Sequence, residues 1–354
     1  MDIQALFERT ALRTLELSNT FPEGSDIPGA IRWYRWDWSI GVAFYGVMKA
    51  YEHSHNESYL MRMKEWIDAR IEQKIPKICI NTNALLLTLL KINEKYPDSR
   101  YESVLKTFDQ YLMSEGLRTP SQALEHTVID NNWGLQVWAD TVFMSLLYMT
   151  HRGIQLSNQS MVDEAMFQLD LHNKLLFDPK EKLFYHGWDD NKRKHIGVHW
   201  GRGNAWMTAG MVEILELTGS DSALSKEISG ILHQQLEKLS ELQHPSGLWR
   251  TVMNSENTYL ETSVTAGIAY GVLKGVRLGI VDPNYLIMGE NALSALLHKV
   301  DEEGNVTGGS SGTPVKANEE AYNQIPYEIT PFTQGLALLA MSEGLKLKSG
   351  RDHS

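Results

Sequence analysis

Asp140 is the acidic residue whose sequence surroundings most directly suggest chemistry. It lies in the segment QVWADTVFM, where Trp138, Val142 and Phe143 flank it and no other charged residue is present. Burial among apolar side chains disfavours the charged form of a carboxyl group and raises its pKa. A carboxylic acid with a raised pKa can act as a general acid near neutral pH. A second interpretation stays open, in which Asp140 caps the helix that follows it.

A second stretch, residues 184–210, combines aromatic rings with a cation. It reads FYHGWDDNKRKHIGVHWGRGNAWMTAG and contains three Trp, three His and Arg202. Tryptophan faces stack on sugar rings, and an arginine offers a planar fork to a carboxylate. The stretch therefore points to an anionic sugar as ligand. The structural alternative is an aromatic packing corner in which Arg202 only stacks on the rings.

Sequence motifs for metal, nucleotide and serine-nucleophile chemistry are absent. His186, His195 and His199 do not have a recognised zinc-binding spacing. The GRG at 201–203 does not follow a predicted strand, and the GGSSG at 308–312 lacks the lysine of a phosphate-binding loop. No G-x-S-x-G sequence occurs. We therefore expect no metal site and no cofactor.

The overall charge restricts the class of partner. The chain has 44 acidic and 33 basic residues, a net charge of −11, which disfavours non-specific binding to nucleic acid or to an anionic membrane. Cys79 is the only cysteine, so no internal disulfide forms, as is typical of a reducing compartment. No uninterrupted apolar stretch reaches the ~18 residues of a membrane span. These features predict a cytoplasmic protein; they do not indicate an oligomeric state.

Most long segments have apolar residues at helical spacing, and strand-like runs are few. This pattern predicts a nearly all-α protein. Because no long low-complexity linker divides the chain, we expect a single domain over residues 1–354. The clearest amphipathic helices are expected at 6–17, 59–71, 101–113, 161–176 and 224–239.

Six further segments begin with aromatic or polar residues and continue as small apolar residues with almost no charge. Helices of this kind are buried on all sides. Six pairs of helices predict a closed ring, an (α/α)6 barrel of six helical hairpins, whose inner helices point their polar ends at one face. An open α-solenoid for protein binding is the alternative. The six segments start near Trp36, Asn81, Gln136, Trp200, Tyr259 and Thr330.

Several motifs together resemble those of glycoside hydrolase family 105, the unsaturated rhamnogalacturonyl hydrolases and related unsaturated glucuronyl hydrolases. The resemblance extends over most of the chain, with its motifs in one order, and it implies an (α/α)6 barrel. The motifs are W-x-W-x-x-G-V at 36–42, Q-V-W-x-D-T at 136–141, H-G-W-D-D at 186–190, W-x-R-G-N-x-W at 200–206, G-L-W at 247–249 and Y-L-E-T-S at 259–263.

The resemblance implies an unusual hydrolysis. Enzymes of this family hydrate the C4=C5 double bond of the unsaturated uronic acid that polysaccharide lyases leave at a non-reducing end. The substrate implied here is an unsaturated oligosaccharide, with unsaturated galacturonyl-rhamnose from pectin as the expected case. Asp140 would be the catalytic acid. The substrate-binding residues implied by the motifs are Trp38, His126, His186, Trp200, Arg202 and Trp206.

One position departs from the family pattern. The family often has a second Asp in the pocket, where this chain has ICINTNALL with Asn81 and Asn83. An Asn at this position, for which we take Asn81, can hydrogen-bond substrate but cannot hold a negative charge. The aglycone sugar would be selected by loops at 119–132, 191–199 and 308–327.

Two other functions remain open from the sequence. The first is a non-catalytic or divergent sugar-binding protein with the same barrel. The second is another (α/α)6 enzyme, such as a sugar epimerase or a glycosidase with two carboxylates. The latter needs a second acid facing Asp140, for which Glu261 is the nearest candidate, although its position in Y-L-E-T-S favours a structural role.

Overall fold

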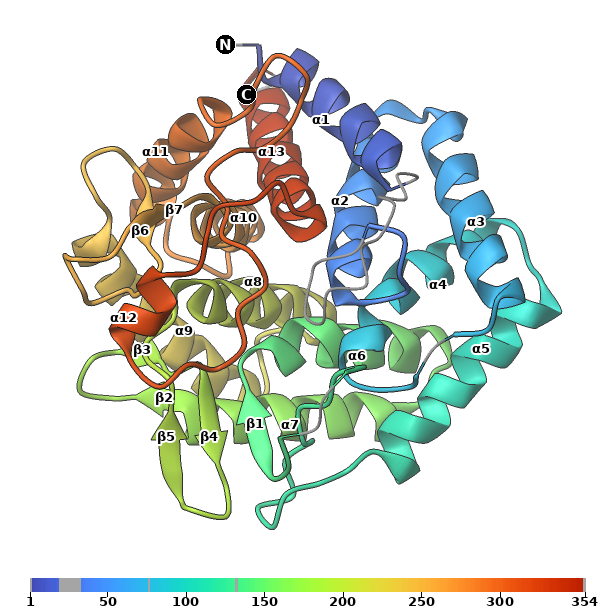
Figure 1. Ribbon diagram of the computed structural model, residues 1–354, viewed down its shortest axis with the longest axis horizontal. Helices are drawn as coiled ribbons and strands as arrows, with labels where there is room; N and C mark the ends of the chain where they lie inside the picture. Colours follow the sequence, from blue (N-terminus) through green and yellow to red (C-terminus); the bar gives the residue numbers. More distant parts are fainter. Residues whose placement is uncertain (1, 19–32, 76, 131–132, 353–354) are drawn as a thin grey trace.

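The fold is a closed ring of helices in two layers (Figure 1). The computed structural model describes residues 2–18, 33–75, 77–130 and 133–352. Each inner helix contacts the next around the ring, directly or through the short helical turn that precedes it, and the last contacts the first. The inner helices are α2 (Trp38–Ser54), α4 (Leu86–Lys95), α6 (Leu147–Gln155), α8 (Gly201–Thr218), α10 (Thr262–Leu278) and α13 (Pro331–Asp352).

Small residues allow the inner helices to approach each other closely. A Cβ atom at Gly46 of α2 would come within 2.5 Å of the carbonyl oxygen of Gly335 in α13. Because this contact joins the first and last inner helices, glycine at both positions permits the ring to close. The predicted (α/α)6 barrel is thus confirmed, and the open solenoid is not formed.

The outer layer consists of amphipathic helices that cover the inner ring. All five predicted amphipathic segments lie in it, and α11 completes the layer. Most of these helices begin at an Asp, Asn or Ser whose side chain accepts a backbone N–H of the first turn. The outer helices are α1 (Ile3–Leu17), α3 (Glu57–Glu72), α5 (Ser99–Gln110), α7 (Gln159–Leu176), α9 (Ala223–Leu242) and α11 (Leu286–Leu297).

The sequence analysis expected the polar starts of all six inner segments to be helical, but some of them are not. The segment from Gln136 begins as strand β1 (Gln136–Trp138) and becomes helical only at Asp140. Strand β1 pairs with β4 (Gly187–Asp189), and β4 pairs with β5 (Lys194–Ile196). The β1–β4 pairing explains the difference, because it satisfies backbone groups that a helix would otherwise satisfy.

Other short elements complete this face of the ring. A 3₁₀ turn, η1 (Asn81–Leu85), precedes α4, and a π-helical turn, η3 (Val142–Leu146), precedes α6. The long segment between α11 and α13 contains the short helix α12 (Glu319–Asn323) (Figure 1). The remaining pairs of strands are β2 (Phe177–Asp178) with β3 (Leu183–Phe184), and β6 (Trp249–Arg250) with β7 (Leu260–Glu261).

The strand pairing positions the residues that the sequence analysis singled out. Trp138 lies opposite Gly187 in the β1–β4 register, and the backbone N–H of Ala139 donates to the carbonyl of His186 at 3.1 Å. The side chains of Asp140 and His186 are therefore held beside each other. Among the described residues, no helix has both the length and the apolar character required to cross a membrane.

Candidate active site

Asp140 and His186 form the centre of the candidate site. Oδ2 of Asp140 lies 3.6 Å from Nε2 of His186, and neither atom has a hydrogen-bond partner among the described residues. The Asp140 side chain is 13% exposed, and that of His186 is fully buried. Unpartnered polar atoms in a buried position are costly and often mark a functional site. The Asp140 Oδ2 atom, moreover, accepts no N–H from the following helical turn, so it does not act as a helix cap.

Tyr322 contacts one of the two ring nitrogens of His186, and this contact bears on the tautomer of the ring. Its hydroxyl oxygen lies 2.6 Å from Nδ1 of His186 and accepts the backbone N–H of Lys316 at 3.3 Å. Because this oxygen already accepts an N–H, we assign the tyrosine O–H as the donor to Nδ1. Burial first, and then the electrostatic effects of His126 and Arg202, hold the pKa of His186 well below its usual value. The imidazole is thus neutral, and this assignment puts its N–H at Nε2, toward Asp140.

Burial also determines the protonation of Asp140. It raises the pKa of this carboxyl group to about 7, because the charged form loses hydration. Arg202, the backbone N–H of Asp140 and the indole of Trp206 act in the opposite direction and favour the carboxylate. Near neutral pH the group is therefore present both as an acid and as a base.

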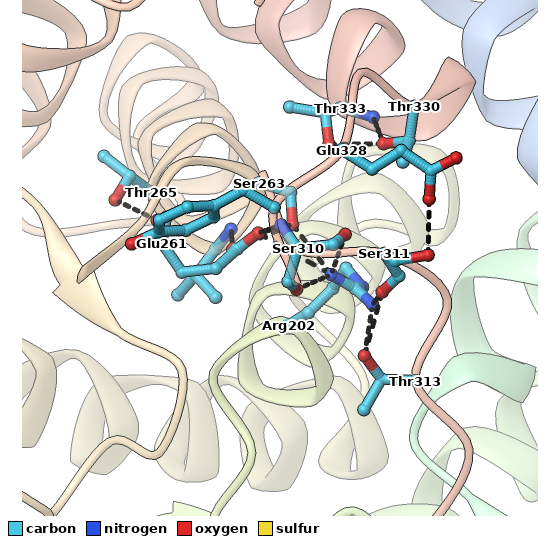
Figure 2. A network of polar contacts seen from close by, with 12 residues as sticks. Arg202, Glu261, Ser263, Thr265, Ser310, Ser311, Thr313, Glu328, Thr330 and Thr333 are labelled. Carbon is cyan, nitrogen blue, oxygen red and sulfur yellow. Dashed lines mark hydrogen bonds and ion pairs between the residues drawn. The ribbon is translucent and has the colours of Figure 1, made fainter. Parts of the chain in front are cut away.

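Arg202 is enclosed by hydrogen bonds on its terminal nitrogens (Figure 2). One of them donates to Ser263 Oγ at 3.1 Å and to Ser310 Oγ at 2.8 Å, and the other donates to Ser311 O and Thr313 Oγ1, each at 3.0 Å. Only Nε, which is buried, lacks a partner among the described residues. The side chain therefore supplies a fixed positive charge, whereas both arms of its fork are already occupied by protein atoms.

Glu261 completes this network, and its carboxylate is bonded to groups other than Asp140. Its carboxylate accepts from the backbone N–H of Val264 at 2.6 Å and from that of Ser310 at 2.5 Å, and it lies 3.7 Å from Arg202. Ser263 donates to it as well. Glu261 thus caps α10 and balances the charge of Arg202, the structural role that its sequence context favoured.

Aromatic side chains connect the predicted residues into one cluster. The ring of His186 stacks on Trp200 with centroids 4.0 Å apart, and Arg202 lies over Trp200 at 4.6 Å. Trp206 contacts Trp38 edge to face at 6.4 Å. Trp200 and Trp206 are 1% and 0% exposed, so neither offers an open ring face, whereas Trp38 is only partly buried.

His126 and Asn81 lie on the neighbouring wall. His126 stacks on Trp138 at 4.5 Å, and its Nδ1 lies 3.0 Å from Thr141 Oγ1, next to Asp140. Its pKa is lowered to about 3, chiefly by burial, so the ring is neutral. The backbone N–H of Asn81 donates to Thr127 O at 3.3 Å, which places Asn81 beside the His126 segment.

The two asparagines of the departing segment differ in their partners. Nδ2 of Asn83 donates to Cys79 O at 3.0 Å and to Ser145 Oγ at 3.0 Å, so this side chain ties η1 to η3. Oδ1 of Asn81 is buried and has no partner among the described residues. Oδ1 of Asn83 is likewise buried and unpartnered among these residues, but the Nδ2 bonds hold this side chain between η1 and η3, so Asn81 is the stronger candidate for binding a ligand.

The other histidines of residues 184–210 have structural partners. Nε2 of His195 lies 3.1 Å from Leu175 O, and Nε2 of His199 lies 3.2 Å from Asp178 Oδ2. No group of three or more His, Cys, Asp or Glu residues in the described ranges is arranged to hold a metal ion.

Sequence reasoning missed three contributors to the site. Tyr322 hydrogen-bonds His186 across a separation of 136 residues, and nothing in its local sequence indicates this contact. Phe332 stacks on Trp38 at 4.7 Å and lies 4.5 Å from Arg202. The segment 310–313 encloses Arg202 with both side-chain and backbone oxygens. Phe332 could have been identified, since it lies in the first turn of a predicted inner helix.

Comparison with known proteins connects this geometry to a family. A family model described as Glycosyl Hydrolase Family 88 matches residues 16–348. Unsaturated rhamnogalacturonyl hydrolase YesR of Bacillus subtilis is 35% identical over 319 residues, which cover 89% of this chain and 91% of the relative. Unsaturated 3S-rhamnoglycuronyl hydrolase of Formosa agariphila is 24% identical over 342 residues, covering 88% and 85%.

Solved structures agree with the sequence comparisons. A possible member of the GH105 family from Salmonella enterica has a TM-score of 0.92 at 28% identity and covers 98% of this chain and 94% of its own. A possible member from Klebsiella pneumoniae has a TM-score of 0.91 at 29% identity, covering 98% and 93%. The expected resemblance to family 105 is thereby confirmed. The chain is a glycoside hydrolase that belongs to Glycosyl Hydrolase Family 88.

Proposed function

We propose that this hydrolase removes a 4,5-unsaturated uronic acid from the non-reducing end of oligosaccharides produced by polysaccharide lyases. The observation that carries the proposal is Asp140, a single carboxyl group with a pKa of about 7 and an unpartnered oxygen beside a neutral histidine. Hydration of a double bond needs one such group, whereas ordinary glycosidases use two flanking carboxylates. The name of the Bacillus relative supports unsaturated galacturonyl-rhamnose as the substrate.

In the first step, protonated Asp140 gives its proton to C4 of the unsaturated ring. The double bond supplies the electron pair for the new C–H bond, and positive charge develops at C5 and the ring oxygen. Asp140 becomes a carboxylate. The Nε2–H of His186 and the charge of Arg202 stabilise that carboxylate, since both lie close to it.

In the second step, water adds to C5 and returns a proton to Asp140. The product is a hemiketal, because C5 carries both the ring oxygen and the new hydroxyl. Ring opening gives a ketone at C5 and leaves C1 as a hemiacetal of the aglycone, which breaks down to an aldehyde and the free sugar. Asp140 ends in its starting form, so one carboxyl group serves as acid and then as base.

The substrate carboxylate at C5 is attracted by Arg202. Both terminal nitrogens of this residue are held by the Ser310–Thr313 segment and Ser263, so Arg202 acts through its charge and its unpartnered Nε–H. Trp38 covers the sugar ring. Trp200 and Trp206 exclude water behind His186 and Asp140, and so they shape the pocket from within.

His126 and Asn81 bind the polar groups of the unsaturated ring. His126 is neutral and Asn81 carries no charge, so neither adds a negative charge beside Asp140. A second carboxylate at Asn81 would raise the pKa of Asp140 further. The amide instead offers a hydrogen-bond acceptor through its unpartnered Oδ1.

The experiment is incubation with unsaturated galacturonyl-rhamnose and measurement of the ultraviolet absorbance of the conjugated double bond. The proposal predicts that absorbance disappears as rhamnose appears in equal amount. A sugar-binding protein without activity would instead raise its own melting temperature with the disaccharide and leave the absorbance unchanged. An epimerase would release no rhamnose.

A further inference from the structure

A cleft beside the candidate active site gathers positive charge on an otherwise acidic protein. It has a volume of about 390 Å³, within the range of small-molecule sites, and lies between the β4–β5 hairpin and residues 315–317. Lys192 and Lys194 line it from the side of the hairpin, and Lys316 lines it from the opposite side. Among the residues that line it are Trp133, Gln136, Asp189, Lys192, Lys194 and Lys316.

Two of the three lysines form no ion pair with a described residue, although Lys194 lies opposite Asp189 in the β4–β5 register. Lys192 pairs with Asp189 at 2.9 Å. Neither Lys194 nor Lys316 forms an ion pair or a side-chain hydrogen bond with any described residue. The cleft therefore holds three lysine charges against one aspartate, whereas the whole chain has a net charge of −11.

The cleft adjoins the catalytic pair. Gly197 lines it, and a Cβ atom at Gly197 would lie 2.5 Å from Tyr322 Oη and 3.0 Å from His186 Cβ. On the other side, Trp133 lies against Trp138 with centroids 4.6 Å apart, and Trp138 contacts His186 at 5.1 Å. The cleft is thus adjacent to His186 and Tyr322, where the sugars that follow the first ring of a bound substrate would lie.

We propose that the cleft binds the carboxylate of a second uronic acid in the aglycone. This inference rests on the proposed function and names the substrate class more closely: acidic oligosaccharides longer than a disaccharide. Lys194 and Lys316 bind the carboxylate from opposite sides, and the partly buried Trp133 offers a surface for the sugar ring beside it. Cations on two separate segments discriminate an acidic from a neutral aglycone better than one flexible lysine.

The test compares three substrates. They are the unsaturated disaccharide, an unsaturated tetrasaccharide whose third sugar is a uronic acid, and the same tetrasaccharide with that uronic acid methyl-esterified. The wild-type enzyme is expected to have a lower KM for the acidic tetrasaccharide than for its ester. The advantage should shrink as salt is added, because partly exposed charges are screened.

Variants assign the effect to the cleft. In Lys194→Gln/Lys316→Gln, the ratio of kcat/KM for the acidic tetrasaccharide to that for the ester should fall by roughly fivefold, as two partly exposed ion pairs allow. Lys226→Gln is the matched control, since Lys226 is an exposed lysine of α9 outside the cleft. It should leave the ratio unchanged.

The results separate this inference from the proposed function. Equal KM values for acid and ester, or an equal change of the ratio in Lys226→Gln, would overturn the acidic subsite even if the disaccharide is hydrolysed. If no substrate is hydrolysed, the proposed function fails, and calorimetric binding of the two tetrasaccharides still tests the cleft. Tighter binding of the acid, lost in the double variant, supports the subsite, and equal binding overturns it.

Discussion

Oδ2 of Asp140 and Nε2 of His186 face each other at 3.6 Å without another partner among the described residues. This separation exceeds a normal hydrogen bond, so the histidine stabilises the charged form of the carboxyl group too weakly to offset its burial. Burial consequently dominates and raises the pKa of Asp140 to about 7. The pair combines an acid that can give up its proton with a donor that can stabilise the resulting carboxylate.

The raised pKa predicts how activity depends on pH. Only the protonated form of Asp140 can donate to C4, so kcat/KM should be nearly constant below the pKa and fall above it. With a pKa of about 7, the decrease between pH 6 and pH 8 should be about tenfold. Rates of disaccharide hydrolysis across this range provide the measurement. A decrease centred near pH 4, where an ordinary aspartate titrates, would be inconsistent with the burial argument.

Because its pKa is raised, Asp140 destabilises the folded protein at pH values where the carboxyl group is charged. Its folded-state pKa lies above the unfolded value, so the group contributes no penalty below pH about 4, and stability is lost as pH rises through about 7. Asp140→Asn removes this loss. At pH 8 the variant should be more stable by as much as roughly 4 kcal/mol.

Denaturant unfolding at two pH values tests this prediction. The stability difference between Asp140→Asn and the wild type should be large at pH 8 and nearly vanish at pH 4. The same difference at both pH values would show that Asp140 does not titrate within this window.

Tyr322→Phe tests whether the tautomer of His186 matters. Loss of the O–H leaves Nδ1 without its donor, so Nε2–H no longer points reliably to Asp140. The kcat value should fall by roughly fivefold to tenfold, as for one lost hydrogen bond of about 1 kcal/mol. The alkaline limb of the pH profile should move to higher pH, since the carboxylate is less stabilised.

Tyr148→Phe is the matched control for this variant. Tyr148 is also fully buried and donates at 2.6 Å, to Asp109 in the outer layer. It should lose stability without a shift of the pH profile. If the alkaline limb of the pH profile does not move in Tyr322→Phe, Tyr322 serves only to pack against its neighbours.

Arg202→Lys is expected to be a damaging change. Lysine keeps the charge but offers three donors without the planar fork, so the contacts to Ser263, Ser310 and Thr313 cannot all form. KM should rise because the positive charge shifts. Arg202→Ala should also lower kcat, and it leaves Glu261 as an uncompensated buried charge, which costs about 3–5 kcal/mol.

Melting temperature and kinetics must be measured together for these variants. Arg152→Lys serves as the control, because Arg152 is buried and paired with Glu102 and Asp109 in the outer layer. It should lower stability with KM unchanged. If Arg202→Lys behaves in the same way, Arg202 supports the fold only.

The ring could be predicted from the sequence because the amino-acid composition of each helix reflects how much of that helix is buried. Inner helices have few charged residues and outer helices are amphipathic, so each pair could be recognised along the chain. The starts of the inner segments were harder to predict. The β1 strand forms only because β4, some 50 residues later, supplies its hydrogen-bond partners.

The candidate site could be predicted only in part for a related reason. Asp140 and His186 lie in motifs that can be recognised from the residues next to them in the sequence. The structure brings the two side chains together. The partner of His186 and the partners of Arg202 come from residues 308–327, whose Gly and Ser content suggests a loop and nothing about its contacts. The assigned roles, the single domain and the cytoplasmic location stay predictions.

The central claim is that Asp140 is the proton donor, and Asp140→Asn tests it most directly. The amide retains the shape of the side chain but cannot donate a proton with a useful driving force. Turnover of unsaturated galacturonyl-rhamnose should fall by about 10²–10⁴, the usual contribution of a general acid, while the disaccharide still binds with nearly unchanged Kd. Retention of more than about a tenth of wild-type turnover would contradict the account.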